Sequence, residues 1–366
     1  MIRRPRSIEN GSGRDCFLPI HTIDPLSDHR WDALISQHPK ASTFHQRAWL
    51  EALARTYGYQ PVVFTTSPPD AALKNGLVYC RVNSWITGSR LVSLPFSDHN
   101  EPIWDSEQEM SALIADSQAA LAQQNWQYLE IRPTSEEFGR IAKPLGFCPI
   151  GRYFLHVLDL QPSLDDLFSA LHVNSVQRRI RRAERAGVVE ECGTSDELLK
   201  DFFALMVITR GRHRLPPPPC AWFRNLVSTH GKGLQIRVAY HHGRPIAAIL
   251  SLRFRSIAYF KYGCSDARFH NLGATPWLLW RTIVDAKSSG ALEFDLGRTE
   301  EENKGLLAFK DHWVPNHRTL IYWRYPGVPA SEVASGWKLK MAKRAFARMP
   351  NKLLELTGNL MYRHIG

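Results

Sequence analysis

Hydrophobic and polar residues alternate along this chain with two different periods, which predict strands in some places and helices in others. The apolar and aromatic runs 256–266 and 291–298 are typical of buried strands. Apolar residues recur every three or four positions in 107–125 and in 277–284, which predicts amphipathic helices. The chain therefore mixes both kinds of element, as α/β and α+β proteins do.

The order of these elements occurs twice. Strands at 76–97 precede the helix at 107–125 and a strand at 126–133, and strands at 234–266 precede a second helix and the strand 291–298. We interpret this as a tandem pair of similar domains, each a mixed, mostly antiparallel sheet flanked by helices. The predicted limits are a disordered basic leader (1–15), two domains (16–153 and 154–326) and a basic helical tail (327–366).

Composition and length agree with this interpretation. The chain has 366 residues, enough for two domains, with 44% hydrophobic and 22% charged residues. Its apolar runs are shorter than the ~20 residues of a membrane span. The six cysteines contain no Cys-x-x-Cys pair, so we expect neither a metal site nor a disulfide scaffold, and a reducing cytoplasm is the simplest setting.

Positive charge is concentrated at the two ends of the chain. The formal net charge is +11, and most of it lies in the leader and in the tail. Such ends on a near-neutral body favour an anionic surface such as a membrane over a dedicated nucleic-acid groove, so we expect no DNA partner. The tail places Leu353, Leu356 and Leu360 on one helical stripe. That stripe predicts either a helix packed on the body or one that binds a membrane surface.

The segment between the strands 256–266 and 291–298 has the features of an anion-binding site. Gly273 lets main-chain N–H groups approach a ligand, and Pro276 suits the first turn of the helix that follows. The N-terminus of that helix carries a partial positive charge. This arrangement suits a pyrophosphate.

Three segments of the chain resemble a known family. The run RFHNLGA (268–274) resembles the pyrophosphate-binding loop of the GNAT acyltransferases, with Asn271 in place of the first glycine. The run FDLGR followed by FKDHW (309–313) resembles a segment of the FemAB-like branch of that superfamily, and SLPFSDHNEPIW (93–104) resembles another. The resemblance implies tandem GNAT-like domains and an acyl-CoA donor. It implies that the donor is held by Arg268, Asn271, Leu272, Gly273 and Ala274.

The resemblance also implies roles in catalysis and in acceptor binding. Lys310 would stabilise the oxyanion that forms when an amine attacks an acyl carbonyl, although a surface lysine is the alternative. Asp98 and His99 would line the acceptor side. Tyr262 would protonate the leaving thiolate, unless it is a core tyrosine.

Three further charged groups are candidates on their own chemistry. Asp295 and Arg298 flank a glycine at the end of a predicted strand, where ligand clefts open. Asp295 is either a general base or a structural partner of Arg298. The arginine run at 178–185, from which we select Arg178 and Arg182, is either a solvated helix face or a clamp for a phosphate-bearing ligand.

The sequence thus predicts a cytoplasmic acyltransferase, peripheral to the inner face of the membrane, acting on an amine of a cell-envelope precursor or a polysaccharide sugar. Two alternatives remain open. One is an aminoacyl-tRNA-dependent transferase that builds peptidoglycan bridges, and the other is a non-catalytic envelope-assembly protein with the same fold.

Overall fold

The computed structural model describes residues 18–86, 88–327 and 351–365, so the predicted leader and the first part of the predicted tail lie outside the described residues. The strands are β1 (His21–Ile23), β2 (Gln60–Thr65), β3 (Leu77–Ser84), β4 (Gly88–Val92), β5 (Leu129–Ile131), β6 (Cys148–Asp159), β7 (Val189–Gly193), β8 (Leu234–His241), β9 (Arg244–Phe254), β10 (Ile257–Ser265), β11 (Glu293–Glu300) and β12 (Arg318–Tyr325). The helices are α1 (His29–Gln37), α2 (Arg47–Tyr57), α3 (Glu107–Gln123), α4 (Glu136–Ala142), α5 (Leu164–Ala170), α6 (Arg178–Arg185), α7 (Asp196–Arg212), α8 (Cys220–His230), α9 (Ala274–Ser288), α10 (Lys304–Asp311) and α13 (Asn351–Ile365).

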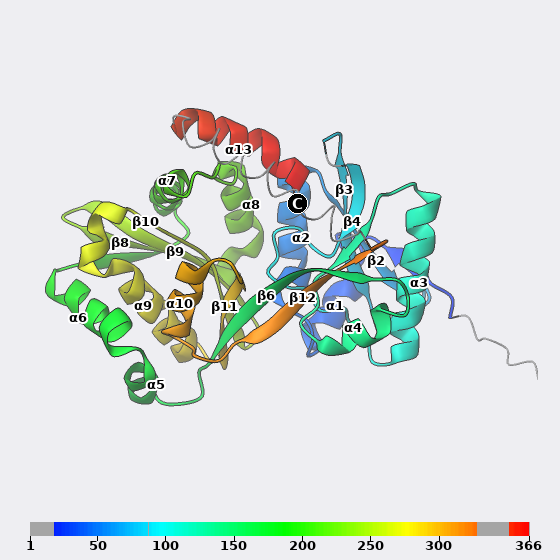
Figure 1. Ribbon diagram of the computed structural model, residues 1–366, viewed down its shortest axis with the longest axis horizontal. Coiled ribbons are helices and arrows are strands. Elements are labelled where there is room, and N and C mark those ends of the chain that lie inside the picture. The colour runs from blue at the N-terminus through cyan, green and yellow to red at the C-terminus, as the bar shows by residue number, and fades with distance from the viewer. Residues whose placement is uncertain (1–17, 87, 328–350, 366) are drawn as a thin grey trace, which may run out of the picture.

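All these strands form one sheet that runs through the whole molecule (Figure 1). Its order is β1-β2-β3-β4-β5-β12-β6-β11-β10-β9-β8-β7. Pairing is antiparallel except between β4 and β5 and between β10 and β11, each a parallel pair joined through a helix, α3 or α9. The mostly antiparallel tandem arrangement predicted from the sequence is confirmed.

The two halves exchange their last strands. β6, which follows the first set of strands, pairs with β11 of the second set, and β12 pairs with β5 of the first. β6 and β12 also pair with each other and join the halves. The boundary that the sequence suggests at 153/154 falls inside β6, so each half is completed by a strand from the other.

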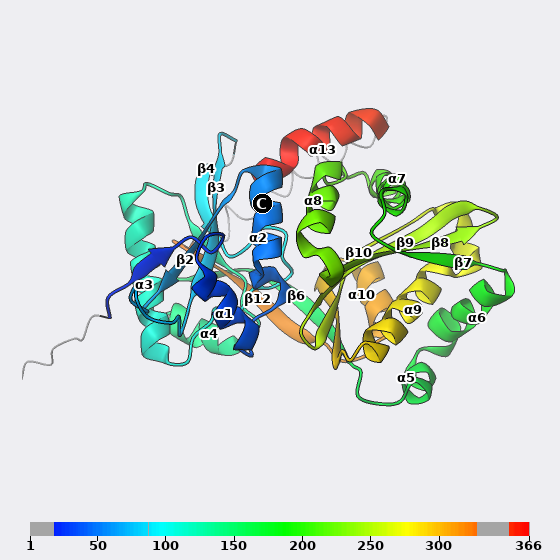
Figure 2. The ribbon, with the colours of Figure 1, turned by 180° about the vertical axis from the view of Figure 1, so that it is seen from behind.

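Helices cover both faces of the second half of the sheet. α7 and α8 lie on one face and α5, α6 and α9 on the other (Figures 1 and 2). The first face belongs to a core that continues into the first half through α2, where Trp49 meets Trp222 edge to face with ring centroids 5.1 Å apart. The second face has its own core around Leu278, Ile283 and Phe294. Each face of the sheet in this half therefore packs against its own hydrophobic core.

Local sequence explains how several helices begin and end. Ser106 and Glu109 form a reciprocal capping box at the start of α3. Gly58 ends α2 in the left-handed conformation that glycine adopts at little cost. Asn303 accepts a hydrogen bond from the Leu306 N–H and so caps α10. This last cap fixes the helix that carries Lys310.

β10 and β11 pair only over their first residues. Their register runs from Ile257 with Glu293 to Tyr259 with Asp295, and no pairing between them follows, although both strands continue. A bulge in β10 lies between Phe260 and Tyr262, just past the last pair. The two strands therefore separate in the middle of the sheet, next to the predicted anion-binding loop.

The described end of the tail is the helix α13, which lies against the body near α7 and β3 (Figure 1). Leu354 and Tyr362 are buried there, and the Tyr59 hydroxyl donates to the main chain of the tail at Tyr362 and Arg363. Leu356 and Leu360, which the predicted stripe contains, are instead exposed. The helix packs through a neighbouring face, because Gly358 allows close approach to the main chain at Pro217. No helix in the described part of the chain is long and apolar enough to cross a membrane.

Candidate active site

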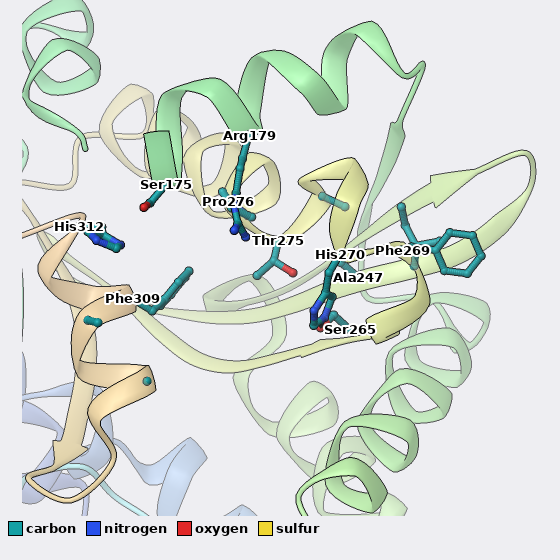
Figure 3. Close-up of a pocket in the computed structure, with 14 residues that line it drawn as sticks. Ser175, Arg179, Ala247, Ser265, Phe269, His270, Thr275, Pro276, Phe309 and His312 are labelled. Atoms are coloured by element: carbon teal, nitrogen blue, oxygen red, sulfur yellow. Dashed lines mark hydrogen bonds between the residues drawn. The ribbon is translucent and has the colours of Figure 1, made fainter. Parts of the chain in front are cut away.

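A cavity of about 330 Å³ opens on the face of the sheet covered by α6 and α9. Its walls come from the turn before α6, the end of β10, the start of α9 and one face of α10 (Figure 3). The polar side chains that line it are Ser175, Arg179, Ser265, His270, Thr275 and His312. Phe309 and Pro276 supply apolar wall. The cavity thus combines a polar rim with apolar surface, as small-molecule sites do.

The N-terminus of α9 opens into this cavity. Gly273 precedes the helix in the left-handed conformation, with a φ of 80°, and Ala274, Thr275 and Pro276 of the first turn line the cavity. Main-chain N–H groups of a first turn have no partner inside the helix and carry partial positive charge. With Arg179 beside this first turn, the cavity suits a phosphate-bearing ligand.

The arginine run on α6 contributes one residue to the cavity wall. Arg179 lines the cavity together with Ser175, one helical turn before it. Arg182 donates to the carbonyl of Asn271, with a distance of 3.2 Å, and so supports the loop from outside. Arg178 lies off this face, because helical positions 175, 179 and 182 share one side. The selection of Arg178 and Arg182 therefore missed the arginine that the cavity contains.

The predicted loop lies beside the cavity, but most of its side chains turn away from it. Arg268 is exposed, and its Nε donates to Asp266, with a distance of 3.0 Å. Asn271 is exposed, and Leu272 packs against the core of this half. A Cβ on Gly273 would collide with the main-chain oxygen of Arg179, so this glycine permits the contact between the loop and α6. Of the five predicted residues, Ala274 lines the cavity.

A buried polar cluster lies where β10 and β11 separate. It contains Asp98, His99, Lys261, Asp295 and Lys310. Lys261 Nζ is 2.8 Å from Asp98 Oδ2 and also donates to the carbonyl of Phe96. Burial by itself would raise the pKa of Asp98, but the neighbouring cations, Lys261 first, outweigh it and hold this pKa below its usual value. The loop of the first half thus inserts a carboxylate into the second half.

Lys310 points into this cluster. Its Nζ donates to the carbonyls of Gly297 and Arg298, with distances of 2.7 and 2.9 Å, and the residue is 2% exposed. Burial lowers the pKa of Lys310 to about 8, against the attraction of Asp98 and Asp295. Gly305, Ala308 and Phe309 of the same helix and His312 just after it line the cavity. Lys310 therefore extends from the other side of α10, towards β11.

His99 and Asp295 form a buried pair across the two halves. His99 Nε2 lies 2.8 Å from Asp295 Oδ2, and Asp295 Oδ1 accepts from the N–H of Gly297 at 2.6 Å. Arg298 is not the partner of Asp295, because its guanidinium lies over Tyr153, 4.3 Å from the ring centroid. The pair lines a second cavity of about 180 Å³ at the junction, together with Lys40, Ser42, Tyr259 and Arg318.

Tyr262 belongs to a different environment. Its hydroxyl accepts from Trp222 Nε1, with a distance of 2.9 Å, and its ring packs on Phe223. Both partners lie on α8, on the face of the sheet away from the 330 Å³ cavity. Burial raises the pKa of Tyr262 well above its usual range. The structure thus places this tyrosine in the core and not at the cavity.

Residues that the sequence did not single out complete both sites. Arg179 lies four residues after Ser175, so the two share one face of a helix. The sequence alone does not show where this helix starts, and therefore does not show that this face is the one at the cavity. His270 and Thr275 flank Gly273 in sequence and follow from the loop prediction. Lys261 reads as an interruption of an apolar strand, and only the fold shows that it meets Asp98.

Comparisons with known proteins concern the family of one domain and the overall fold. Residues 171–310 match the family described as acetyltransferase (GNAT) domain, and this range includes both α9 and α10. No curated protein sequence matches the chain significantly. Among solved structures, FemX superposes with a TM-score of 0.67 at 14% identity, covering 87% of this chain and 99% of FemX.

Two further structures have the same fold. L-PGS from Bacillus licheniformis gives a TM-score of 0.56 at 12% identity, covering 88% of this chain and 97% of that one. A tandem GNAT protein from the clavulanic acid biosynthesis pathway gives 0.55 at 12% identity, covering 85% and 100%. Residues 171–310 therefore match a GNAT acetyltransferase domain, and the chain as a whole has the fold of these tandem GNAT structures.

Proposed function

We propose that the protein is an N-acyltransferase that moves an acyl group from acyl-CoA to the amine of a cell-envelope precursor or a polysaccharide sugar. The observation that carries the proposal is the pair of cavities on either side of the point where β10 and β11 separate. One cavity has the chemistry of a phosphate-bearing donor site. The other has a histidine–carboxylate pair at its wall.

The larger cavity would hold the donor. The first turn of α9 and Arg179 would bind its phosphates, and the apolar wall at Phe309 would contact its chain. The donor supplies an acyl group activated as a thioester. Its acyl end would enter the gap between β10 and β11, since main-chain pairing stops after Tyr259 and Asp295.

The smaller cavity would hold the acceptor amine. The amine nitrogen attacks the thioester carbonyl carbon, a C–N bond forms and the C–S bond breaks. His99, oriented by Asp295, takes the proton from the attacking amine and passes it to the departing thiolate. Lys310, held by two carbonyls of β11, provides positive charge near the oxyanion. The products are an amide and a free thiol.

Arg179 offers a direct test with a matched control. Arg179→Ala removes a guanidinium from the cavity wall, whereas Arg178→Ala removes an exposed one next to it on the same helix. An Arg–phosphate contact contributes roughly 1.5–3 kcal/mol, so calorimetry with acetyl-CoA should show about 10- to 100-fold weaker binding for Arg179→Ala. Arg178→Ala should bind as the wild type does. Equal effects of both changes, or no binding by the wild type, would reject an acyl-CoA donor in this cavity.

A second candidate function is favoured by one observation. Arg178, Arg181 and Arg185 are exposed on α6, beside the mouth of the donor cavity. Such a basic face suits the backbone of a nucleic acid, so an aminoacyl-tRNA donor is the alternative. Binding of charged tRNA that weakens steeply with salt, without binding of acetyl-CoA, would select it. Acceptor binding without turnover from either donor would select a non-catalytic protein.

A peripheral location at the inner membrane surface fits the exposed apolar residues. Trp85 and Ile86, at the tip of the β3–β4 hairpin, are 87% and 54% exposed, and Leu356 and Leu360 on α13 are 55% and 63% exposed. The hairpin and α13 reach the same side of the molecule (Figure 1), where the Trp85 ring lies 5.6 Å from that of His364. In the sequence, most of the basic residues of the tail come directly before α13.

Vesicle sedimentation tests this location. The double change Trp85→Ser with Leu360→Ser should reduce binding to vesicles that contain phosphatidylglycerol. Leu292→Ser, at an exposed leucine before β11, is the control and should leave binding unchanged. If the wild type stays in the supernatant with anionic vesicles, the peripheral location is rejected.

A further inference from the structure

Three potential metal ligands converge beyond the end of α10, outside both cavities. They are His156 on β6, Asp311 at the last position of α10 and His317 just before β12. His156 Nε2 lies 2.9 Å from Asp311 Oδ1, and His317 Nδ1 lies 3.7 Å from the same oxygen. One ligand atom from each side chain lies within 4.8 Å of the other two. We propose that this His–Asp–His cluster binds a divalent transition-metal ion of the zinc type.

The spacing of the ligands fits such an ion. Bonds of about 2.05 Å from zinc to nitrogen or oxygen in a tetrahedron put neighbouring ligand atoms ~3.3 Å apart. The two observed separations, 2.9 and 3.7 Å, lie on either side of this value. The two imidazole nitrogens lie within 4.8 Å of each other, so side-chain rotation would bring the three atoms to coordination distance without a change of the main chain.

The ligand types select among metals. Two imidazoles and one carboxylate suit zinc, cobalt, nickel or iron, whereas calcium and magnesium prefer all-oxygen sites. Three protein ligands leave a coordination position for water. Asp311 and His317 have side chains 37% and 30% exposed, so an ion can enter from solvent.

The ring of His156 is fully buried and presents its Nε2, the atom that would bind the ion, to Asp311. The rings of His156 and His317 lie 5.2 Å apart, and the His317 ring also packs on Phe154 at 4.2 Å. These contacts hold both imidazoles near Asp311.

The position of the cluster would let a bound ion hold α10 in place. Asp311 follows Lys310 directly, and the other ligands belong to β6 and to the segment before β12. A bound ion would tie the C-terminal end of α10 to the two strands that join the halves. It would therefore act as a clamp that positions α10. The sequence analysis searched for paired cysteines and could not predict this site. Its ligands are two histidines and an aspartate, and position 156 is far from positions 311 and 317 in the sequence.

Cobalt and zinc titration of the untagged protein, first stripped with EDTA, tests the proposal. We expect one Co²⁺ per chain at micromolar or tighter affinity, with the visible absorption of a low-symmetry site and no thiolate charge-transfer band. Zn²⁺ should displace it. His317→Ala and Asp311→Asn should each weaken binding at least tenfold, and His312→Ala, one residue from the cluster, should not.

A second readout separates binding from misfolding. Zn²⁺ should raise the melting temperature of the wild type and of His312→Ala, and should raise that of His317→Ala by clearly less at the same concentration. Circular dichroism of the metal-free variants confirms that they fold. No binding by the wild type at micromolar concentrations overturns the proposal. So does binding that neither His317→Ala nor Asp311→Asn weakens, since the ion would then be held by other histidines.

Discussion

The Asp98–Lys261 ion pair allows a quantitative test of how the two halves are joined at the site. Lys261 Nζ lies 2.8 Å from Asp98 Oδ2, with side chains 5% and 19% exposed. At this distance, attraction in a medium of effective dielectric constant about 20 is roughly 6 kcal/mol before desolvation is subtracted. Removing one member of a buried pair costs about 3–5 kcal/mol, because the other charge stays buried without its partner.

The surroundings make the two single changes unequal. Asp98→Asn leaves Lys261 buried without its partner and repelled by Lys310, so we expect a loss of about 3–5 kcal/mol in the free energy of unfolding. Lys261→Met leaves a carboxylate that Lys310 and Arg298 still attract, so its cost should be smaller, about 2–3 kcal/mol. The double variant, which removes both charges, should cost less than the sum of the two by about 2 kcal/mol or more.

Urea denaturation of the four proteins in this cycle measures these differences. The turnover of the same four proteins is also measured. If the double variant regains stability but not activity, Asp98 has a role at the acceptor beyond the ion pair. If the single costs add to within about 0.5 kcal/mol, the two charges do not interact, and the reasoning fails.

Three further predictions concern other parts of the structure. Burial lowers the pKa of His45 from 6.5 to about 4, so the folded state binds fewer protons than the unfolded state between these values. The free energy of unfolding should therefore fall by up to about 3 kcal/mol as the pH drops from 7 to 4, and His45→Gln should flatten this slope in acid titration. Lys310→Met should lower turnover by roughly 10²–10³-fold at unchanged donor affinity, and a rate within a factor of about two of the wild type would remove Lys310 from catalysis. Gly273→Ala should destabilise the chain, since the new Cβ meets Arg179 and the residue has a φ of 80°, and a thermal melt equal to that of the wild type would contradict this close contact.

The sequence predicts correctly those features whose signals lie close together along the chain. The strand–loop–helix around Gly273 could be predicted because glycine, proline and helical spacing are local signals. Lys310 was selected from the resemblance of its segment to a known family, and the structure buries it in the polar cluster instead of leaving it on the surface. The contact between His99 and Asp295 joins positions 196 residues apart, so no local pattern contains it.

The predictions for Tyr262 and for the leucine stripe of the tail were wrong for the same reason, which is that contacts distant in the sequence decide both. Tyr262 lies in a strand whose alternation shows that the residue has a face, but not which helices cover that face. Leu356 and Leu360 form a helical stripe, yet Gly358 sets which side of α13 approaches the body. In both cases, a segment distant in the sequence determines which face of the element is buried.

The exchange of final strands has a consequence for the order in which this chain can mature on the ribosome. β5 has one neighbour, β4, until β12 emerges, nearly 190 residues later. A nascent chain that ends before β12 exposes an unpaired strand edge in the middle of its future sheet, and such edges invite association with other chains. Truncation between the halves would therefore yield two fragments that each lack a central strand, so cutting the gene at the domain boundary is a poor way to obtain either half as a folded protein.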